Sequence, residues 1–372
     1  MPAPFEIFLA APPGLEPLLC AEAAAAGFAA PSAVPGGVTV LGGWPEVWRA
    51  NLELRGAGRV LARIGAFRAM HLAQLDKRAR KLAWGDVLRA DVPLRLDVTT
   101  RKSRIYHAGA ARSRIAAAIR ETLGAPVPDD PPEDAVTLKV RIDDDLCTLS
   151  VDTSGAPLHR RGAKQAVNAA PMRETLAALF LRAAGYGGTE PVLDPMCGSG
   201  TFVLEAAEIA LGLAPGRARA FAFERLASFD PGAWSALKAA LRPRPTAFRF
   251  HGSDRDAGAV AMGRANAARA GVVDVTAFRQ AAISDLRRPD GPPGLVIVNP
   301  PYGARLGEAA KLRPLYAALG RVLAERFDGW RAALVTTDAT LAAAAGLPFG
   351  PPGPPVPHGP LRVRLWQTGP LP

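Results

Sequence analysis

Apolar residues change their spacing along the chain, and the change divides the chain into two parts. Before residue 156, short apolar stretches of strand length alternate with stretches whose apolar residues recur every three to four positions, as on one helix face. This pattern predicts small α/β units, ending in a hairpin over residues 136–151 that is interrupted at Asp143–Asp145. The other strands predicted here are residues 5–10, 38–41, 59–67 and 94–99, and the helices are residues 14–26, 44–54, 72–81 and 110–123.

From Met172 onward, helices and apolar strands alternate regularly, which is typical of a doubly wound, mostly parallel sheet with helices on both faces. We interpret residues 158–171 as a linker that docks onto this domain. The Pro- and Gly-rich residues 347–359 predict a long surface connection, and residues 359–368 predict a closing antiparallel strand. The remaining predicted strands are residues 191–195, 248–252, 275–280, 295–298 and 332–337, and the helices are residues 201–213, 257–270 and 314–327.

Length and charge narrow the class of protein. A chain of 372 residues is too long for one ordinary domain, and its 49% hydrophobic and 21% charged residues are typical of a globular protein. The formal charge of +11 is concentrated, because sixteen Lys and Arg stand against four Asp between Arg55 and Arg120. This clustering favours a nucleic-acid partner held through its phosphates over a merely solvated basic face.

A basic segment that is suited to phosphate binding follows the strand predicted at residues 94–99. Its positive side chains lead into a helix whose first N–H groups are free, so that charge and backbone donors point the same way. The residues expected to contact phosphate are Arg101, Lys102, Arg104, His107, Arg112 and Arg114.

Several other classes of protein are disfavoured. Cys20, Cys147 and Cys197 lie far apart without a C-x-x-C pair, which argues against a disulfide framework and a zinc site and fits a reducing compartment. The five histidines show no metal-ligand spacing, so we expect no metal. Without a signal peptide or about eighteen consecutive apolar residues, a cytoplasmic protein with no membrane partner is expected.

A strand, an acidic residue, a glycine turn and a helix follow one another in VLDPMCGSGT, residues 192–201. The glycines allow backbone to approach a ligand closely, and the helix start offers free N–H groups. Asp194 would repel a pyrophosphate, and Val203 stands where a dinucleotide site needs its third glycine. An acid here suits instead the positive amino and sulfonium groups of S-adenosylmethionine. A tight turn without any ligand is the alternative.

Further acids follow the next two strands. Asp254, in GSDRD, stands where a carboxylate can accept hydrogen bonds from both ribose hydroxyls of a nucleotide, and Asp256 is predicted to be the N-cap of the following helix. Asp285, in AISDL, follows the third strand. It could receive an adenine amino group, and on position alone an ordinary surface acid fits equally well.

The tetrapeptide Asn299-Pro300-Pro301-Tyr302 directly follows the apolar strand at residues 295–298. An exocyclic base amine is a poor nucleophile, because its lone pair is delocalised into the ring. The Asn299 amide oxygen and the Pro300 carbonyl can each accept one N–H and so direct the lone pair toward a methyl donor. The prolines stiffen the loop, and Tyr302 offers a face on which an extruded base can stack. We therefore predict methyl transfer to a base amine.

These blocks, in this order, resemble the THUMP-domain-containing guanine-N2 RNA methyltransferases, in particular those acting on bacterial 23S rRNA. The resemblance covers nearly the whole chain, from TTRKSRIYHAGAARSRIAAAI through LDPMCGSGTFVLEAAEIA and NPPYGARLG to HGPLRVRL. It implies a Rossmann-like class I methyltransferase domain at residues 156–372. An α+β ferredoxin-like domain at residues 1–65 and a THUMP domain at residues 66–155, which would bind RNA through the basic segment, would precede it.

The resemblance also implies a role for each motif residue. Asn299, Pro300, Pro301 and Tyr302 would hold the target guanine. The residues expected to bind S-adenosylmethionine are Pro171, Asp194, Pro195, Met196, Cys197, Gly198, Gly200, Thr201, Asp254, Asp285 and Asn299. The implied partner is 23S rRNA or a ribosomal assembly intermediate.

Three alternatives stay open. Similar tetrapeptides serve tRNA guanine-N2 enzymes and DNA adenine-N6 enzymes, although the basic N-terminal part argues against DNA. A non-catalytic RNA-binding assembly factor should have lost residues such as Asp194 or Asn299, which are intact. Some relatives carry a second methyltransferase domain; because this chain ends at Pro372, we expect a single activity.

Overall fold

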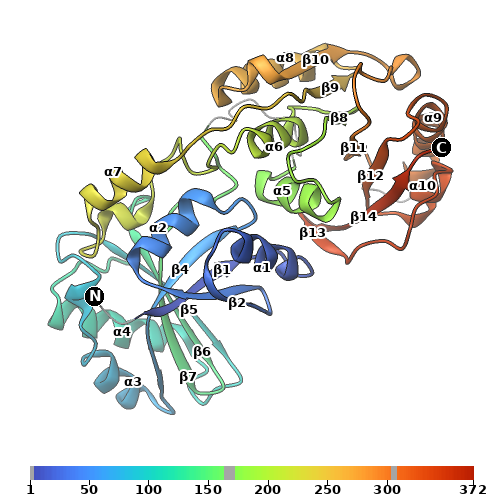
Figure 1. Cartoon of the computed structure of the whole chain (residues 1–372). Coiled ribbons are helices and arrows are strands. Elements are labelled where there is room, and N and C mark those ends of the chain that lie inside the picture. Colours follow the sequence, from blue (N-terminus) through green and yellow to red (C-terminus); the bar gives the residue numbers. More distant parts are fainter. Residues whose placement is uncertain (1–3, 163–171, 303–307) are drawn as a thin grey trace. The chain divides into compact units, whose positions relative to one another are not determined.

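The computed structural model describes residues 4–162, 172–302 and 308–372. The chain forms two compact units, each containing one seven-stranded sheet (Figure 1). Unit 1 comprises Met1–Ala11, Cys20–Leu158 and Arg219–Ala240, and unit 2 comprises Pro12–Leu19, His159–Ala218 and Leu241–Pro372. Pro171 lies outside the described residues, so its predicted contact with the cofactor has no structural description.

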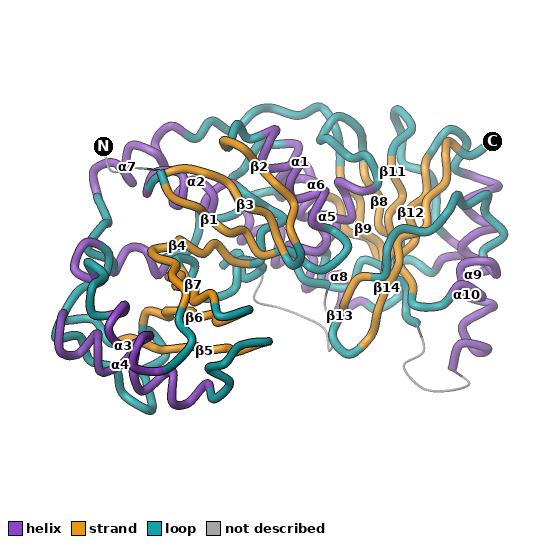
Figure 2. The backbone as a smooth tube through the Cα atoms, turned by 90° about the horizontal axis from the view of Figure 1, so that it is seen from below, coloured by secondary structure: helices purple, strands orange, loops and turns teal. Residues whose placement is uncertain are grey.

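The sheet of unit 1 has the strand order β2-β3-β1-β4-β7-β6-β5. Neighbouring strands are antiparallel except for the parallel pair of β5 and β6. The strands are β1 (Phe5–Ala10), β2 (Ala29–Val34), β3 (Gly37–Gly42), β4 (Arg59–Arg68), β5 (Leu94–Arg101), β6 (Val136–Asp143) and β7 (Leu146–Asp152). Figure 2 shows the strands of this sheet running from β2 to β5.

Strand β4 is the centre of this sheet. It pairs with β1 through residues 59–62 and with β7 through residues 61–68, with an irregularity between Arg63 and Gly65. The boundary predicted between residues 65 and 66 therefore falls within a continuous strand. The extent of the predicted ferredoxin-like and THUMP domains stays a prediction.

Four of the helices in unit 1 were expected from the sequence, and a fifth, α7 (Pro231–Ala240), was not. The four are α1 (Glu16–Ala25), α2 (Trp44–Glu53), α3 (Leu72–Ala79) and α4 (Ala108–Thr122). Short 3-10 turns occur at Trp84–Asp86 and Ala222–Arg225. Helix α1 begins in unit 2 and ends in unit 1. In α2, the Glu46 carboxylate accepts the Gly43 N–H at 2.8 Å, which satisfies a donor that the helix start leaves free.

The sheet of unit 2 has the strand order β10-β9-β8-β11-β12-β14-β13. The first five strands are parallel, whereas β14 is antiparallel to β12 and β13 is antiparallel to β14. The predicted parallel sheet with an antiparallel closing strand is thus confirmed. The strands are β8 (Val192–Asp194), β9 (Phe250–Asp254), β10 (Thr276–Gln280), β11 (Leu295–Val298), β12 (Arg331–Thr336), β13 (Val356–His358) and β14 (Leu361–Pro370).

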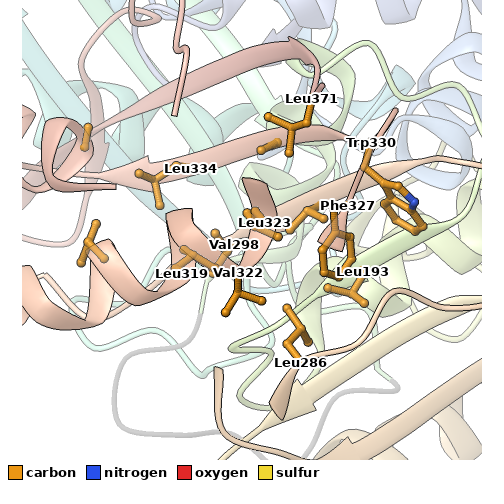
Figure 3. Close-up of a cluster of buried hydrophobic side chains, with 14 of the residues drawn as sticks. Leu193, Leu286, Val298, Leu319, Val322, Leu323, Phe327, Trp330, Leu334 and Leu371 are labelled. Carbon is orange, nitrogen blue, oxygen red and sulfur yellow. The ribbon is translucent and has the colours of Figure 1, made fainter. Parts of the chain in front are cut away.

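The helices of unit 2 are α5 (Glu174–Ala183), α6 (Thr201–Ala210), α8 (Ala257–Ala270), α9 (Glu308–Arg326) and α10 (Ala339–Ala344). A hydrophobic cluster lies between α9, α10 and strands β8, β11 and β12 (Figure 3). Within it, the Phe327 and Trp330 rings meet edge to face at 5.6 Å, and both side chains are fully buried. Burial of each such side chain stabilises the fold by about 1.5–3 kcal/mol.

This core fixes the strand from which the tetrapeptide starts. All four residues of β11 are buried, as expected for a central parallel strand. Because β8 lies between β9 and β11, the carboxyl ends of these three strands share one edge of the sheet. Ligands of open α/β sheets bind in the crevice at that edge.

Candidate active site

A cavity of about 570 Å³ lies in unit 2, lined by the segments that follow β8, β9 and β11. The three motifs singled out in the sequence meet around it. The predicted cofactor residues that line the cavity are Asp194, Pro195, Met196, Cys197, Gly198, Thr201, Asp254 and Asn299, and Pro301 of the tetrapeptide joins them. Their predicted roles as cofactor ligands stay predictions, but their assembly around one cavity is a finding.

Asp194 is the buried acid of the site. Its side chain is 3% exposed, and it accepts a hydrogen bond from the Met196 N–H at 3.1 Å. Burial, reinforced by the nearby Asp254 carboxylate, raises the pKa of Asp194 to about 8. Within the described ranges, no Lys, Arg or His forms an ion pair with it. A cationic ligand would supply the missing countercharge and favour the ionised form.

Asp254 joins the first two motifs. One of its carboxylate oxygens accepts the Gly198 N–H and the other accepts the Asp256 N–H, both at 3.0 Å. Each oxygen keeps a lone pair for a ligand hydroxyl, as a ribose contact requires. The Asp256 side chain accepts the Gly258 N–H at 2.8 Å and is the N-cap of α8, which confirms its predicted role.

Gly200 is required for close packing of the glycine turn against Phe278. It does not line the cavity, and its φ of +87° is in the left-handed region at the N-cap of α6. A Cβ at this position would lie 2.9 Å from the Phe278 ring. Gly252 and Gly263 face the same ring, where a Cβ would lie 2.7 Å away. This glycine therefore makes room for Phe278, a role that the motif alone did not indicate.

The tetrapeptide begins where β11 ends. Asn299 is half-buried, and its amide makes a hydrogen bond to the Tyr302 phenol. Burial raises the pKa of Tyr302 to about 12, and this hydrogen bond acts in the opposite direction. Because this hydrogen bond lowers the pKa of the phenol, the Asn299 amide nitrogen donates it, and the Asn299 Oδ1 takes no part in it. This buried oxygen accepts no hydrogen bond from any described residue. An unpaired buried acceptor is costly, and an N–H donor on a ligand would satisfy it.

Tyr302 also meets a residue from the other end of the domain. Its ring lies edge-on to the His358 imidazole, with centroids 6.5 Å apart. Burial, and then the positive charge of Arg173, lowers the pKa of His358, which favours a neutral ring beside the tyrosine. Pro300 is buried, and neither Pro300 nor Tyr302 lines the cavity.

The part of the cavity wall where Asp285 was expected is formed by its neighbours in the sequence instead. Asp285 is exposed and does not line the cavity; the residues that do are Ala281, Ala282 and Ile283. Ile283 offers an apolar surface rather than a hydrogen-bond acceptor. Helix α9 adds Lys311, Leu312 and Leu315, and Arg255 follows Asp254. The sequence analysis did not identify these three α9 residues or Arg255. Of the four, only Arg255 carried a local signal, because it lies inside the GSDRD motif.

The basic segment of unit 1 divides into two groups. Arg101, Lys102, Arg104 and Arg114 are exposed. Arg112 instead forms an ion pair with Asp129 at 2.9 Å and donates to the Pro128 carbonyl at 3.1 Å. The His107 Nδ1 accepts the Ala110 N–H at 3.1 Å and caps α4. The predicted RNA contacts of all six residues stay predictions, but two of them have structural tasks of their own.

Sequence reasoning also missed Tyr106 in this segment. Its side chain is 83% exposed, and the Thr100 hydroxyl donates to its carbonyl at 2.9 Å. An exposed aromatic ring among exposed basic side chains is a surface on which a nucleic-acid base can stack. The signal was present in the sequence, as an aromatic residue within RKSRIYH.

Two other kinds of site do not occur in the described part of the chain. No three His, Cys, Asp or Glu side chains there come together to hold a metal ion. No helix within those ranges combines the length and apolarity needed to cross a membrane.

Comparison with known proteins identifies the family. Residues 161–348 match the RMKL-like methyltransferase domain, and residues 6–61 match the RlmL ferredoxin-like domain. A protein named ribosomal RNA large subunit methyltransferase K/L from Syntrophotalea carbinolica is 37% identical over 366 residues, covering 93% of this chain and 51% of that protein. The chain thus spans about half the length of the curated relatives it matches.

Solved structures are similar over the whole chain. A Listeria monocytogenes protein, whose name predicts an N6-adenine-specific DNA methylase, is 29% identical with a TM-score of 0.87, covering 99% of this chain and 97% of that one. The protein SMU.472, in complex with S-adenosylhomocysteine (SAH), is 26% identical with a TM-score of 0.87 and full coverage of both chains. The matched domain contains the segments that line the cavity, and together with the identity to the relatives this shows that the chain belongs to the RMKL-like methyltransferase family.

Proposed function

We propose that this protein transfers a methyl group from S-adenosylmethionine to the exocyclic N2 amine of a guanine in 23S rRNA. The observation that carries the proposal is the buried Asn299 Oδ1, which accepts no hydrogen bond from any described residue, at the edge of a cavity lined by Asp194, which forms no ion pair with any described residue. Among the residues that the structure describes, no cation pairs with Asp194 and no N–H donor reaches the Asn299 Oδ1. A cationic methyl donor beside an amine acceptor would satisfy both.

Different residues around the cavity would bind different parts of the methyl donor. Asp194 would pair with the positive amino group of the methionine end, and Asp254 would accept the ribose hydroxyls. Ile283 and its neighbours would pack on the flat adenine base. When bound, the donor supplies an electrophilic methyl group on a sulfonium. Membership in a methyltransferase family and the bound SAH of SMU.472 support this choice of donor.

The tetrapeptide would prepare the amine for attack. Asn299 Oδ1 and the Pro300 carbonyl each accept one amine N–H, which directs the nitrogen lone pair toward the methyl carbon. Transfer would form the N–C bond as the S–C bond of the donor breaks, leaving a neutral thioether, and the methylated nitrogen would then lose a proton to solvent. Tyr302 stacks on the base. No strong general base is required, because the proton leaves after transfer.

Two observations favour ribosomal RNA as the substrate. The curated relatives carry the name of a large-subunit rRNA methyltransferase, and the exposed basic side chains of unit 1 suit an RNA backbone. The name of the Listeria protein specifies adenine in DNA instead, so base and polymer both need a test.

The test uses total rRNA and tRNA from a strain that lacks the gene, incubated with the purified protein and isotopically labelled S-adenosylmethionine. We expect label in N2-methylguanosine of 23S rRNA. Label in N6-methyladenosine or in tRNA would refute the assigned base or polymer. Asn299→Ala should reduce turnover by about a hundredfold or more while SAH binding persists, and normal turnover in that variant would exclude the role of the amide.

A further inference from the structure

We propose that Tyr316 is a positioning residue for the tetrapeptide, because its hydroxyl fixes the one backbone torsion before Tyr302 that the two prolines leave free. Tyr316 lies on α9 and is fully buried. Its hydroxyl donates to the Pro301 carbonyl at 3.2 Å. The inference rests on the proposed function, and its test is arranged so that the two can fail separately.

The backbone argument starts from the sequence Asn299-Pro300-Pro301-Tyr302. Proline rings hold φ of Pro300 and Pro301 near about −65°. The residue before a proline is itself confined to extended ψ values, which restricts Asn299 and Pro300. The first torsion without such a restriction is ψ of Pro301. That torsion turns the peptide plane containing the Pro301 carbonyl, and it sets the direction in which the chain enters Tyr302.

Tyr316 acts on this torsion, because a hydrogen bond to a carbonyl fixes the plane of its peptide. It also takes up one of the two lone pairs of the Pro301 carbonyl. Two local restrictions and one tertiary contact together would hold the acceptors and the stacking ring in place. Such advance positioning of groups lowers the barrier to reaction.

The protons in this contact can be assigned from the partners alone. The Pro301 carbonyl can only accept, so the single hydroxyl proton of Tyr316 points to it. The Tyr316 and Thr336 hydroxyl oxygens lie 3.3 Å apart, and Thr336 must therefore donate to Tyr316. The Thr336 oxygen in turn accepts the Asp338 N–H at 3.3 Å. The chain of donors starts at a backbone N–H and ends at a backbone carbonyl, so its direction is unique.

The far end of this hydrogen-bond chain lies in regular secondary structure. Thr336 is fully buried at the end of β12, in the middle of the sheet. Asp338 is the N-cap of α10 and accepts the Thr340 N–H at 2.7 Å. The Pro301 carbonyl is therefore tied to the sheet and to a capped helix rather than to a surface side chain.

Tyr316→Phe is the test, because it keeps the buried ring and removes only the hydroxyl. Single-turnover methylation of 23S rRNA from the deletion strain should slow about three- to tenfold, the range that corresponds to one ordinary hydrogen bond. SAH affinity should stay within about twofold, since Asp194 and Asp254 are untouched. A rate constant that fell with an equal loss of SAH affinity would overturn the positioning role.

A second buried tyrosine provides a matched control. Tyr186 is 5% exposed, and its hydroxyl donates at 2.8 Å to the Ala206 carbonyl on α6 of the same unit rather than to the tetrapeptide. Tyr186→Phe should lower the melting temperature about as much as Tyr316→Phe, with turnover unchanged. If the two variants lost the same share of turnover, the effect of Tyr316 would be one of stability and the proposal would be wrong.

Further variants test the direction of the hydrogen bonds from Thr336 through Tyr316 to Pro301, and whether they act through Tyr302. Thr336→Ser keeps the donor and should retain turnover, whereas Thr336→Val should lose part of it. In a Tyr302→Ala background, Tyr316→Phe should cause little additional loss, because the ring that it positions is absent. Fully additive losses would refute the coupling. If Asn299→Ala abolishes turnover while Tyr316→Phe does not change it, this inference fails and the proposed function stands.

Discussion

Acidification is expected to weaken the binding of SAH through one carboxylate, that of Asp194. Burial raises the pKa of this residue from 3.8 to about 8 in the ligand-free protein. Below pH 8 the side chain is mainly neutral, and each further pH unit reduces its ionised fraction about tenfold. The ligand's positive amino group pairs with the ionised form only. The apparent Kd therefore rises in inverse proportion to the ionised fraction.

The size of the effect follows from the pKa. About a tenth of Asp194 is ionised at pH 7 and about a hundredth at pH 6, so Kd should rise about tenfold, or about 1.4 kcal/mol. The α-amino group of the ligand has an ordinary pKa of about 7.7–8.0 and stays protonated over this interval. Titration calorimetry measures the Kd at each pH. In buffers of different ionisation enthalpy, it should also detect about 0.9 proton released per ligand bound at pH 7.

Asp194→Asn is the control variant. It should bind SAH weakly and without this pH dependence. Between pH 3.8 and 8 the native protein retains a proton that the unfolded chain loses, so the contribution of Asp194 to stability falls as the pH rises through that window. The Asn variant should lack this fall. A wild-type Kd that stays constant between pH 6 and 7, or an equally steep change in the Asn variant, would refute the reasoning.

Two further predictions concern the fold and the RNA surface. Gly200→Ala should lower the free energy of unfolding by about 1–3 kcal/mol in denaturant titrations, because the left-handed backbone and the Phe278 ring both oppose a Cβ. Gly187→Ala, where no atom lies within 4 Å, should be nearly neutral, and equal losses would contradict the packing argument. Changing Arg101, Lys102 and Arg104 together to alanine should weaken RNA binding and flatten its salt dependence, by about 0.7 in the log–log slope per lost contact to single-stranded RNA. Arg112→Ala, which loses an ion pair to Asp129, should change the slope less; an unchanged slope in the triple variant would place the RNA surface elsewhere.

The elements that were not predicted show what a local sequence pattern can and cannot indicate. β2 has Pro31 and mostly exposed positions, so neither apolar alternation nor residue preference marked it as a strand. Its strand character comes from pairing with β3. Helix α7 did carry a local signal, since Asp230 followed by Pro231 is a common N-cap and first-turn pair. The Asp230 side chain indeed accepts the Gly232 N–H at 2.8 Å.

The cavity could be predicted in part for a similar reason. Asp194 and Asp254 are the last residues of the parallel strands β8 and β9, Asn299 directly follows β11, and the ends of such strands gather at one edge. Their meeting was therefore predictable from the order of the strands along the chain. Lys311 and Leu315 reach the same cavity from α9, and nothing in their local sequence indicates the part of the sheet that this helix covers.

Apart from elements such as β2 and α7, the order of helices and strands follows from the sequence alone, as do the acid before the glycine turn and the two prolines that stiffen the tetrapeptide. These are properties of neighbouring residues, because periodicity, φ restriction and capping all act within a few positions. Only the folded chain reveals that Phe278 fills the space left by three glycines and that Tyr316 holds the Pro301 carbonyl. Such pairs join residues far apart in the chain, and close packing in the core, which no local pattern records, selects the partner.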